Sequence, residues 1–273
     1  MDKKTTSRDG TSLAYGVIGQ GPTVILVSGA MSTGGTVAPL ARRLADRCTA
    51  VVYDRRGRGA SGDTAPYDVD REIEDLAALI DAVGGEAALF GVSSGGALVL
   101  RAAASGLPVA RAAVYEVPYA DHLAGGAARE ATYKEQLGKA LGEDRLGDAV
   151  ELFLRLTGLG EEMIQRARES PMWAGMEAVA PSLAHDDAVM GDGLLPRDRL
   201  AAIGVPVLAV AGGASPGWMR EASREIAQTV PQGTYRVLEG QTHMVEPDVL
   251  GPVLAEFFAG QGPRARRAPN DRA

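Results

Sequence analysis

The sequence predicts an α/β fold with a mostly parallel central sheet, flanking helices and an inserted helical segment. Three observations lead to this prediction. Short apolar runs rich in β-branched residues alternate with stretches of helical periodicity up to residue 117 and again after residue 195. The joins between these stretches are short, which favours parallel strands connected by helices. Between residues 118 and 195 only helical patterns occur.

The first half is expected to contain five strands and three helices. The expected strands are residues 12–18, 23–27, 49–53, 87–92 and 110–117. The expected helices are residues 37–47, 70–83 and 94–104, and a Gly-Gly pair ends the second of them.

The remaining elements divide into an insertion and a second α/β half. The insertion is expected to form helices at residues 122–141, 144–157, 161–170 and 171–189. Strands at 205–211 and 234–238 and helices at 218–229 and 249–258 then follow. Ligands bind at the carboxyl edge of such sheets, so we expect the insertion to lie over that edge as a cap. The predicted organisation is a core of residues 1–117 and 196–259, a helical cap of 118–195 and a disordered tail of 260–273.

The composition limits the classes of function. The chain has 273 residues, 45% of them hydrophobic, and a net charge of −7, which argues against a nucleic-acid partner. No signal peptide is evident, and no run of about eighteen apolar residues predicts a membrane span. The single cysteine, Cys48, fits a reducing compartment. We expect a cytoplasmic protein with a small-molecule substrate and no membrane or nucleic-acid partner, and a homodimer is an open option.

Two serines stand in the pattern Gly-x-Ser-x-Gly, Ser93 and Ser215. In a nucleophile elbow, the backbone N–H that follows the serine helps to bind the oxyanion. Ser94 can supply this N–H, whereas Pro216 has none. Ser93 also stands between an expected strand and an expected helix. Ser93 is therefore the candidate nucleophile.

A serine nucleophile needs a base, and the chain offers His122, His185 and His243. His243 follows the last expected strand, at the sheet edge where Ser93 is also expected. His122 and His185 fall in the inserted helical segment, where a surface, core or pocket-lining role is expected. His243 is therefore the candidate general base.

These motifs together resemble the α/β-hydrolase-fold superfamily, in its serine-nucleophile members with a helical cap. The resemblance covers about residue 10 to residue 259 and rests on residues 28–30, 54–59, 91–95 and 240–243. In this superfamily the loop after the third strand supplies a second oxyanion N–H, which implies Ala30 beside Ser94. Ser28 stands where the superfamily usually has a histidine.

The acid of the implied triad is displaced. The superfamily commonly places it after the strand that follows the cap, and here Ser215 occupies that position. A serine cannot stabilise an imidazolium as a carboxylate does. Some members carry the acid one strand earlier, just before the cap. That assignment implies Glu116, with Asp121 in reserve and an acid-free dyad as the remaining option.

Other residues have less specific patterns. The charged run at 54–58 is expected to form a structural loop. No cluster has metal-ligand spacing and no phosphate-binding Gly-Lys motif occurs, so we expect no metal and no cofactor. The candidate pocket residues are Ser28, Met172, Trp173, Met176 and Trp218. An equally good interpretation is that the last four only pack helices together.

The resemblance implies a cofactor-independent serine hydrolase, a carboxylesterase or thioesterase, acting through an acyl-enzyme on Ser93. The substrate is expected to be small to medium and largely apolar. Two alternatives stay open: a non-hydrolytic enzyme on the same fold, for C–C cleavage, elimination or cyclisation in natural-product biosynthesis, and a non-catalytic ligand-binding protein. A serine at the elbow argues against dehalogenase and epoxide hydrolase chemistry, which use an aspartate there.

Overall fold

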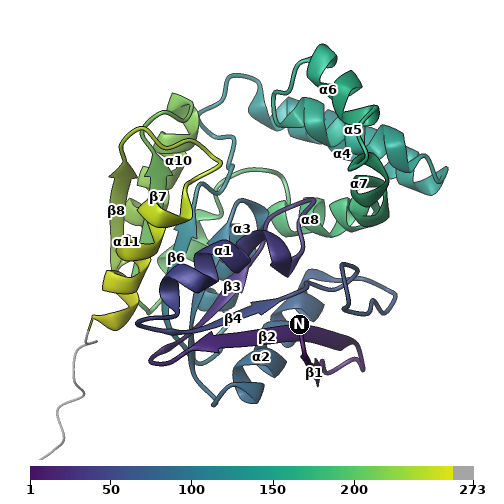
Figure 1. Cartoon of the computed structure of the whole chain (residues 1–273). Helices are drawn as coiled ribbons and strands as arrows, with labels where there is room; N and C mark the ends of the chain where they lie inside the picture. The colour runs from purple at the N-terminus through teal and green to yellow at the C-terminus, as the bar shows by residue number, and fades with distance from the viewer. Residues whose placement is uncertain (261–273) are drawn as a thin grey trace, which may run out of the picture.

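The structure is a computed structural model that describes residues 1–260, and its centre is an eight-stranded sheet (Figure 1). The strands are β1 (Lys3–Thr6), β2 (Ser12–Gly19), β3 (Thr23–Val27), β4 (Thr49–Tyr53), β5 (Ala87–Val92), β6 (Val109–Tyr115), β7 (Val207–Gly212) and β8 (Gly233–Leu238). Their order is β1-β2-β4-β3-β5-β6-β7-β8. All pairs from β4 to β8 are parallel, while β1 and β2 join antiparallel at one edge. The predicted fold class is therefore confirmed.

Helices cover both faces of the sheet because its central strands are apolar on both sides. In β3, Ile25 and Val27 face one helical layer, while Val24 and Leu26 face the other. The helices of these layers are α1 (Gly34–Leu44), α2 (Val69–Ala82), α3 (Ser94–Ala104), α9 (Arg197–Ala201), α10 (Gly217–Thr229) and α11 (Pro247–Ala259). α1 and α11 pack on one face, and α2, α3, α9 and α10 pack on the other.

The chain between β6 and β7 forms a separate group of helices, here called the helical insertion (residues 126–190). Its elements are α4 (Gly126–Gly142), α5 (Leu146–Leu156), α6 (Glu161–Arg168), α7 (Trp173–Val179), a 3₁₀ turn (Ala180–Ser182) and α8 (Leu183–Met190). In Figure 1, α4 to α7 stand apart from the layers that cover the sheet, while α8 lies next to α3. The insertion has its own apolar cluster, and Ala30 and Met31 from the loop after β3 pack against it.

The structure differs from the predicted elements in a few places. β1 was not predicted because Lys3–Thr6 is an exposed edge strand without apolar alternation. The short α9 was also not predicted. The segment 171–189 forms α7, a 3₁₀ turn and α8 rather than one helix, because Pro181 lacks an N–H and interrupts the helical hydrogen bonding. The first helix of the insertion begins only after Gly125, which has a φ of 71°. The predicted tail lies outside the described residues except for Gly260.

The strand register brings the candidate residues to one edge of the sheet. Val27 at the end of β3 pairs with Gly91, and Val92 at the end of β5 pairs with Tyr115. Tyr115 in turn pairs with Val210 in β7. The segments that follow β3, β5, β6 and β7 therefore emerge side by side. No helix within residues 1–260 combines the length and the apolar character needed to cross a membrane.

Candidate active site

Ser93 occupies a sharp turn between β5 and α3. Its φ of 55° and ψ of −129° are conformations that non-glycine residues rarely adopt. The turn is possible because glycines let the backbone segments approach closely. A Cβ atom placed on Gly91 would lie 2.3 Å from the carbonyl oxygen of Gly95, and one on Gly95 would lie 2.5 Å from that of Ser28. The predicted strand–turn–helix setting of Ser93 is therefore present.

The loop after β3 lies directly against this turn. A Cβ atom placed on Gly29 would lie 3.1 Å from Ser93 Cβ and 3.7 Å from Ser93 Oγ. Ala30 follows in the same loop, and Ser94 is the first residue of α3, where helical N–H groups lack intrahelical acceptors. Neither the Ala30 N–H nor the Ser94 N–H donates a hydrogen bond within residues 1–260. Both groups are thus free to bind an oxyanion.

His243 and Glu116, which lie 127 positions apart in the chain, are joined by a hydrogen bond. His243 Nδ1 lies 2.9 Å from Glu116 Oε2. The Glu116 side chain is fully buried, and its other oxygen accepts the N–H of Gly212 at 2.7 Å. The His243 ring is 37% exposed, so its free edge can meet a ligand. A carboxylate that holds Nδ1 leaves Nε2 as the nitrogen available for proton transfer.

The structure does not join His243 to Ser93 directly. Within residues 1–260, no side-chain hydrogen bond involves Ser93 Oγ or His243 Nε2. The structure therefore brings together two of the three predicted catalytic residues by a direct contact, and it places the third at the same edge of the sheet.

Residues 24–250 match the model of the alpha/beta hydrolase family. The chain belongs to this family. It is 50% identical to an alpha/beta hydrolase from Sphaerobacter thermophilus, which it matches over 94% of this chain and 100% of the other, with a TM-score of 0.85. It is similar to the 2-(acetamidomethylene)succinate hydrolase of Mesorhizobium japonicum, with 28% identity over 88% of this chain and 89% of the relative. A thermophilic esterase from Thermogutta terrifontis shares the fold, with a TM-score of 0.72, 22% identity and coverage of 93% and 97%.

Asp121, the alternative acid of this alpha/beta hydrolase, contacts residues other than His243. Asp121 accepts the N–H of Leu195 at 2.7 Å and pairs with Arg197 at 3.0 Å. Asp121 therefore links the start of the inserted segment to the chain beside α9. At the position after β7 where the family commonly has its acid, Ser215 is buried, and its hydroxyl has no hydrogen-bond partner within the described part of the chain.

The other two histidines make contacts outside the candidate active site. His122 lies 2.7 Å from a carboxylate oxygen of Glu225 on α10, at the surface. His185 on α8 is buried and stacks on Tyr67, with ring centroids 3.8 Å apart. Burial lowers the pKa of His185, against the nearby charge of Asp63. The sequence analysis had preferred His243 to these two as the candidate base only because of its position after the last expected strand.

The predicted pocket residues differ in burial and in the elements they pack against. Met172 is 72% exposed and lies just before α7, and its pocket-lining role stays a prediction. Trp173 and Met176 belong to the apolar cluster of the insertion, where they pack helices together. Trp218 is half-buried in α10, and Ser28 is fully buried with no hydrogen-bond partner for its hydroxyl within residues 1–260.

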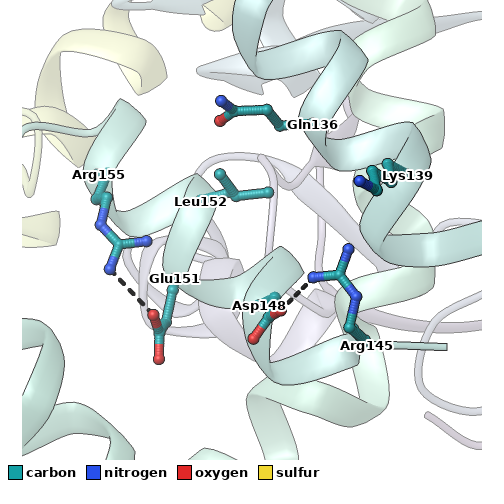
Figure 2. A pocket seen from close by; sticks show the side chains of 7 residues that line it. All are labelled: Gln136, Lys139, Arg145, Asp148, Glu151, Leu152 and Arg155. Carbon is teal, nitrogen blue, oxygen red and sulfur yellow. Dashed lines mark hydrogen bonds and ion pairs between the residues drawn. The ribbon is translucent and has the colours of Figure 1, made fainter. Parts of the chain in front are cut away.

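A polar groove lies within the insertion, between α4 and α5 (Figure 2). Its volume is about 340 Å³. The residues that line it are Gln136, Lys139, Arg145, Asp148, Glu151, Leu152 and Arg155. None of them is a predicted site residue, and ion pairs within the groove bind most of its charges. In the part of the chain that the structure describes, no group of three or more His, Cys, Asp or Glu could hold a metal ion.

Sequence reasoning assigned no direct role to two buried arginines that hold the loop after β3. Arg58 Nη1 donates to the Gly29 carbonyl at 2.6 Å and to the Ser32 carbonyl at 3.2 Å. Arg55 Nη1 donates to the Ser28 carbonyl at 3.3 Å. Both side chains are fully buried, so the charged run is braced inside the protein rather than solvated. The sequence did contain one indication of this role, because the charged run directly follows β4 and therefore lies at the same edge of the sheet.

Proposed function

We propose that this protein is a cofactor-independent serine hydrolase that cleaves an ester or thioester of a small to medium, largely apolar molecule. The observation that supports this proposal most is the hydrogen bond between Glu116 and His243. The proposal is supported because this oriented imidazole follows the last strand and Ser93 stands on a sharp turn at the same edge of the sheet. An oriented base at the same sheet edge as a half-buried serine is an arrangement that supports nucleophilic catalysis.

The proposed reaction proceeds in two halves. His243 Nε2 takes the proton of Ser93 as the hydroxyl oxygen attacks the substrate carbonyl. The oxyanion that forms is bound by the N–H groups of Ala30 and Ser94. Collapse of this intermediate breaks the bond to the alcohol or thiol, which leaves with the proton from His243. Water then attacks the acyl-enzyme in the same way and releases the acid.

Glu116 acts through His243 in this scheme. Its carboxylate accepts a hydrogen bond from the Nδ1–H group, which fixes the tautomer and stabilises the imidazolium that forms during proton transfer. The hydrogen bond between Ser93 and His243 is expected to form when substrate binds, since catalytic contacts are often loose in a free enzyme. The helical insertion then serves as the predicted cap of residues 118–195 and keeps water from the reacting carbonyl.

The test is hydrolysis of p-nitrophenyl esters of increasing acyl length. Ser93→Ala is expected to lower kcat by at least about 10³-fold, because it removes the nucleophile. Ser215→Ala is the matched control, since Ser215 stands in the same Gly-x-Ser-x-Gly pattern but precedes a proline. The control is expected to keep wild-type kcat. Full activity in Ser93→Ala would reject the proposal.

One observation favours a second function, a non-hydrolytic reaction on the same fold. Ser93 Oγ has no hydrogen bond to a base within the described residues, so the serine could act as a hydrogen bonder beside acid–base chemistry at His243. A fluorophosphonate probe separates the two. Labelling of Ser93 supports the hydrolase, while turnover without labelling supports the second function. Ligand binding with neither labelling nor turnover would indicate a binding protein.

A further inference from the structure

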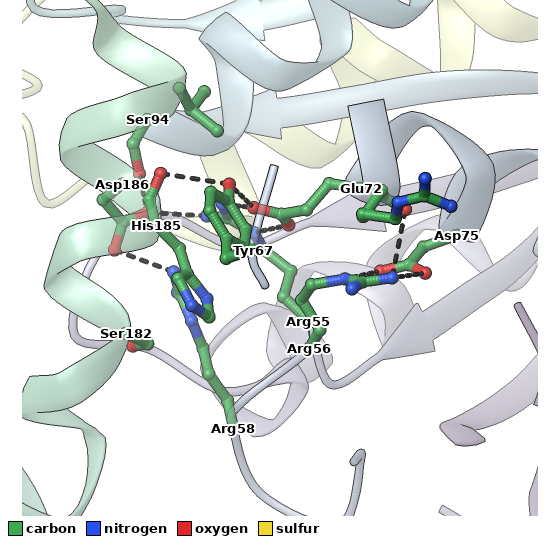
Figure 3. A network of polar contacts seen from close by, with 12 residues as sticks. Arg55, Arg56, Arg58, Tyr67, Glu72, Asp75, Ser94, Ser182, His185 and Asp186 are labelled. Atoms are coloured by element: carbon green, nitrogen blue, oxygen red, sulfur yellow. Dashed lines mark hydrogen bonds and ion pairs between the residues drawn. The ribbon is translucent and has the colours of Figure 1, made fainter. Parts of the chain in front are cut away.

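A single buried carboxylate on the insertion contacts the proposed oxyanion hole. Asp186 on α8 accepts hydrogen bonds from Arg55 Nη1 at 2.7 Å, from Arg58 Nη2 at 2.7 Å and from the hydroxyl of Ser94 at 2.8 Å. Figure 3 shows these groups converging on the helix that carries Asp186 and His185. The carboxylate thus has three charged or polar donors, each from the core rather than from the insertion.

Two of these three donors, Ser94 and Arg58, also contact the two sides of the oxyanion hole. Ser94 carries one of the two proposed N–H donors on its own backbone. Arg58 binds the carbonyls of Gly29 and Ser32, which lie on either side of the second donor, Ala30. Asp186 is therefore connected to both N–H groups, through one hydroxyl on one side and one guanidinium on the other.

The geometry of the arginines is fixed from the opposite side. Glu72 on α2 binds Arg55 through both of its oxygens, each at 2.7 Å, so the guanidinium plane cannot rotate freely. This bidentate pair directs Arg55 Nη1 at Asp186 and at the Ser28 carbonyl. Two guanidinium groups and two carboxylates balance in charge, which is the condition under which buried ions are tolerated.

We propose that Asp186 is a positioning residue for the oxyanion hole, through which the helical insertion sets the directions of the Ala30 and Ser94 N–H groups. The proposal rests on the proposed function, because it assumes that these groups bind an oxyanion formed at Ser93. Misplacement of about 1 Å at such donors can cost about 100-fold in rate. Loss of Asp186 therefore reduces the rate of the chemical step without removing any group that touches the substrate.

The ionisation of Asp186 agrees with this role. Burial by itself would raise its pKa, but the charges of Arg58 and Arg55 and the hydrogen bonds from Arg58 and Ser94 hold the pKa below the ordinary value. The carboxylate is thus charged at neutral pH and can accept all three hydrogen bonds at once.

The same network contains a matched control. Asp75 on α2 binds Arg56 through both oxygens, at 2.7 and 2.8 Å, and both side chains are buried. The other acceptors of Arg56 are Asp9 and the Arg71 carbonyl. None of these lies in the loop after β3 or at Ser94. Loss of the Asp75 charge therefore disturbs a buried ion pair without disturbing the oxyanion hole.

The experiment measures kcat, KM and urea unfolding for the wild type, Asp186→Asn and Asp75→Asn with a p-nitrophenyl ester. Asp186→Asn is expected to lower kcat by about 10-fold to 100-fold with KM within about twofold, because the lost positioning acts only in the transition state. Asp75→Asn is expected to keep kcat within about threefold, and the urea measurement reports its effect on stability separately. Wild-type kcat in Asp186→Asn, or an equal loss of kcat in Asp75→Asn, would overturn the inference.

A further variant keeps the inference testable if Asp186→Asn does not fold. Ser94→Ala removes only the hydroxyl that Asp186 binds and keeps the backbone N–H. It is expected to lower kcat several-fold at unchanged KM, and an unchanged kcat counts against the inference. A wild type whose turnover does not depend on Ser93 is a different result, because it rejects the proposed function itself.

Discussion

At the scale of single residues, backbone strain is concentrated at the proposed site. Within residues 1–260, four non-glycine residues have a positive φ, and three of them are Met31, Ser93 and Glu116. Each such residue costs roughly 1–3 kcal/mol and persists only where the surrounding structure holds it. Glu116 is held by the Gly212 N–H and by His243, which together use both oxygens of its carboxylate.

Glu116→Gln tests the role of this carboxylate. The amide keeps the size of the side chain but has no charge to stabilise the imidazolium, so kcat is expected to fall by about 10² to 10⁴-fold. Asp121→Asn is the control, since Asp121 binds Leu195 and Arg197 instead, and it is expected to keep wild-type kcat. Steady-state ester hydrolysis measures both. Little change in the kcat of Glu116→Gln would reject Glu116 as the triad acid but would leave the assignment of Ser93 as nucleophile unaffected.

At the scale of elements, the end of β6 positions the loop that carries His243. Tyr115 is the last residue of β6, and its hydroxyl donates to the Thr242 carbonyl at 2.6 Å. Glu116 follows it directly and binds His243 itself. The loop after β8 is thus attached at two adjacent residues, the last residue of a buried central strand and the residue that follows it. An imidazole on such a loop has less freedom than its exposure suggests.

Tyr115→Phe should loosen this attachment. The variant loses one hydrogen bond and leaves the Thr242 carbonyl without it, so the free energy of unfolding is expected to fall by about 1 kcal/mol. The rate of ester hydrolysis is expected to fall several-fold because His243 is less well placed.

Tyr53→Phe is the matched control for this prediction. Tyr53 is also a buried tyrosine of the sheet, but its hydroxyl has no hydrogen-bond partner among residues 1–260. Its removal is expected to leave stability and rate unchanged within experimental error. A loss of stability in Tyr53→Phe equal to that in Tyr115→Phe would contradict the assigned role of the hydrogen bond.

At the scale of the whole molecule, buried ion pairs connect three parts of the chain. Arg55 joins Glu72 on α2 to Asp186 on the insertion, and Arg56 joins Asp75 on α2 to Asp9 near the edge strands. Burial opposes the ionisation of Glu72, but the charge and hydrogen bonds of Arg55 outweigh it and lower its pKa. The pKa of Asp186 is lowered by the same kind of contact.

These lowered pKa values predict that stability falls on acidification. The unfolded chain takes up protons near the ordinary values, 4.5 for Glu and 3.8 for Asp, while the folded carboxylates stay ionised to lower pH. The unfolded state then binds more protons, so the free energy of unfolding decreases as pH falls below about 4.5. Asp75, whose pKa is raised by burial, contributes with the opposite sign.

Urea unfolding between about pH 7 and about pH 3.5 measures this effect. Glu72→Gln removes one of the carboxyl groups with a lowered pKa, so the stability of the variant is expected to be lower at neutral pH and to decline less steeply on acidification. An equally steep decline in the variant would show that other carboxyl groups cause the acid sensitivity.

The fold could be predicted where local patterns are strong. The bounds of β3, β4, β5 and α3 agree with the expected ranges, because continuous apolar runs and a helix next to a glycine-rich turn leave few alternatives. β1 could not be predicted in this way, since its pairing with β2 depends on the backbone and not on apolar side chains.

The sequence by itself determined the fold class, the strand–turn–helix setting of Ser93 and the position of His243 after the last strand. These depend on local patterns, such as a glycine-rich turn between an apolar run and a helix. Only the tertiary structure decided that Glu116, rather than Asp121, contacts His243, since contact across 127 positions requires strand order and register. It also decided that Arg55 and Arg58 lie buried against Asp186. The sequence could not show this, because a run of charged residues has the same sequence pattern whether its side chains are solvated or paired in the interior.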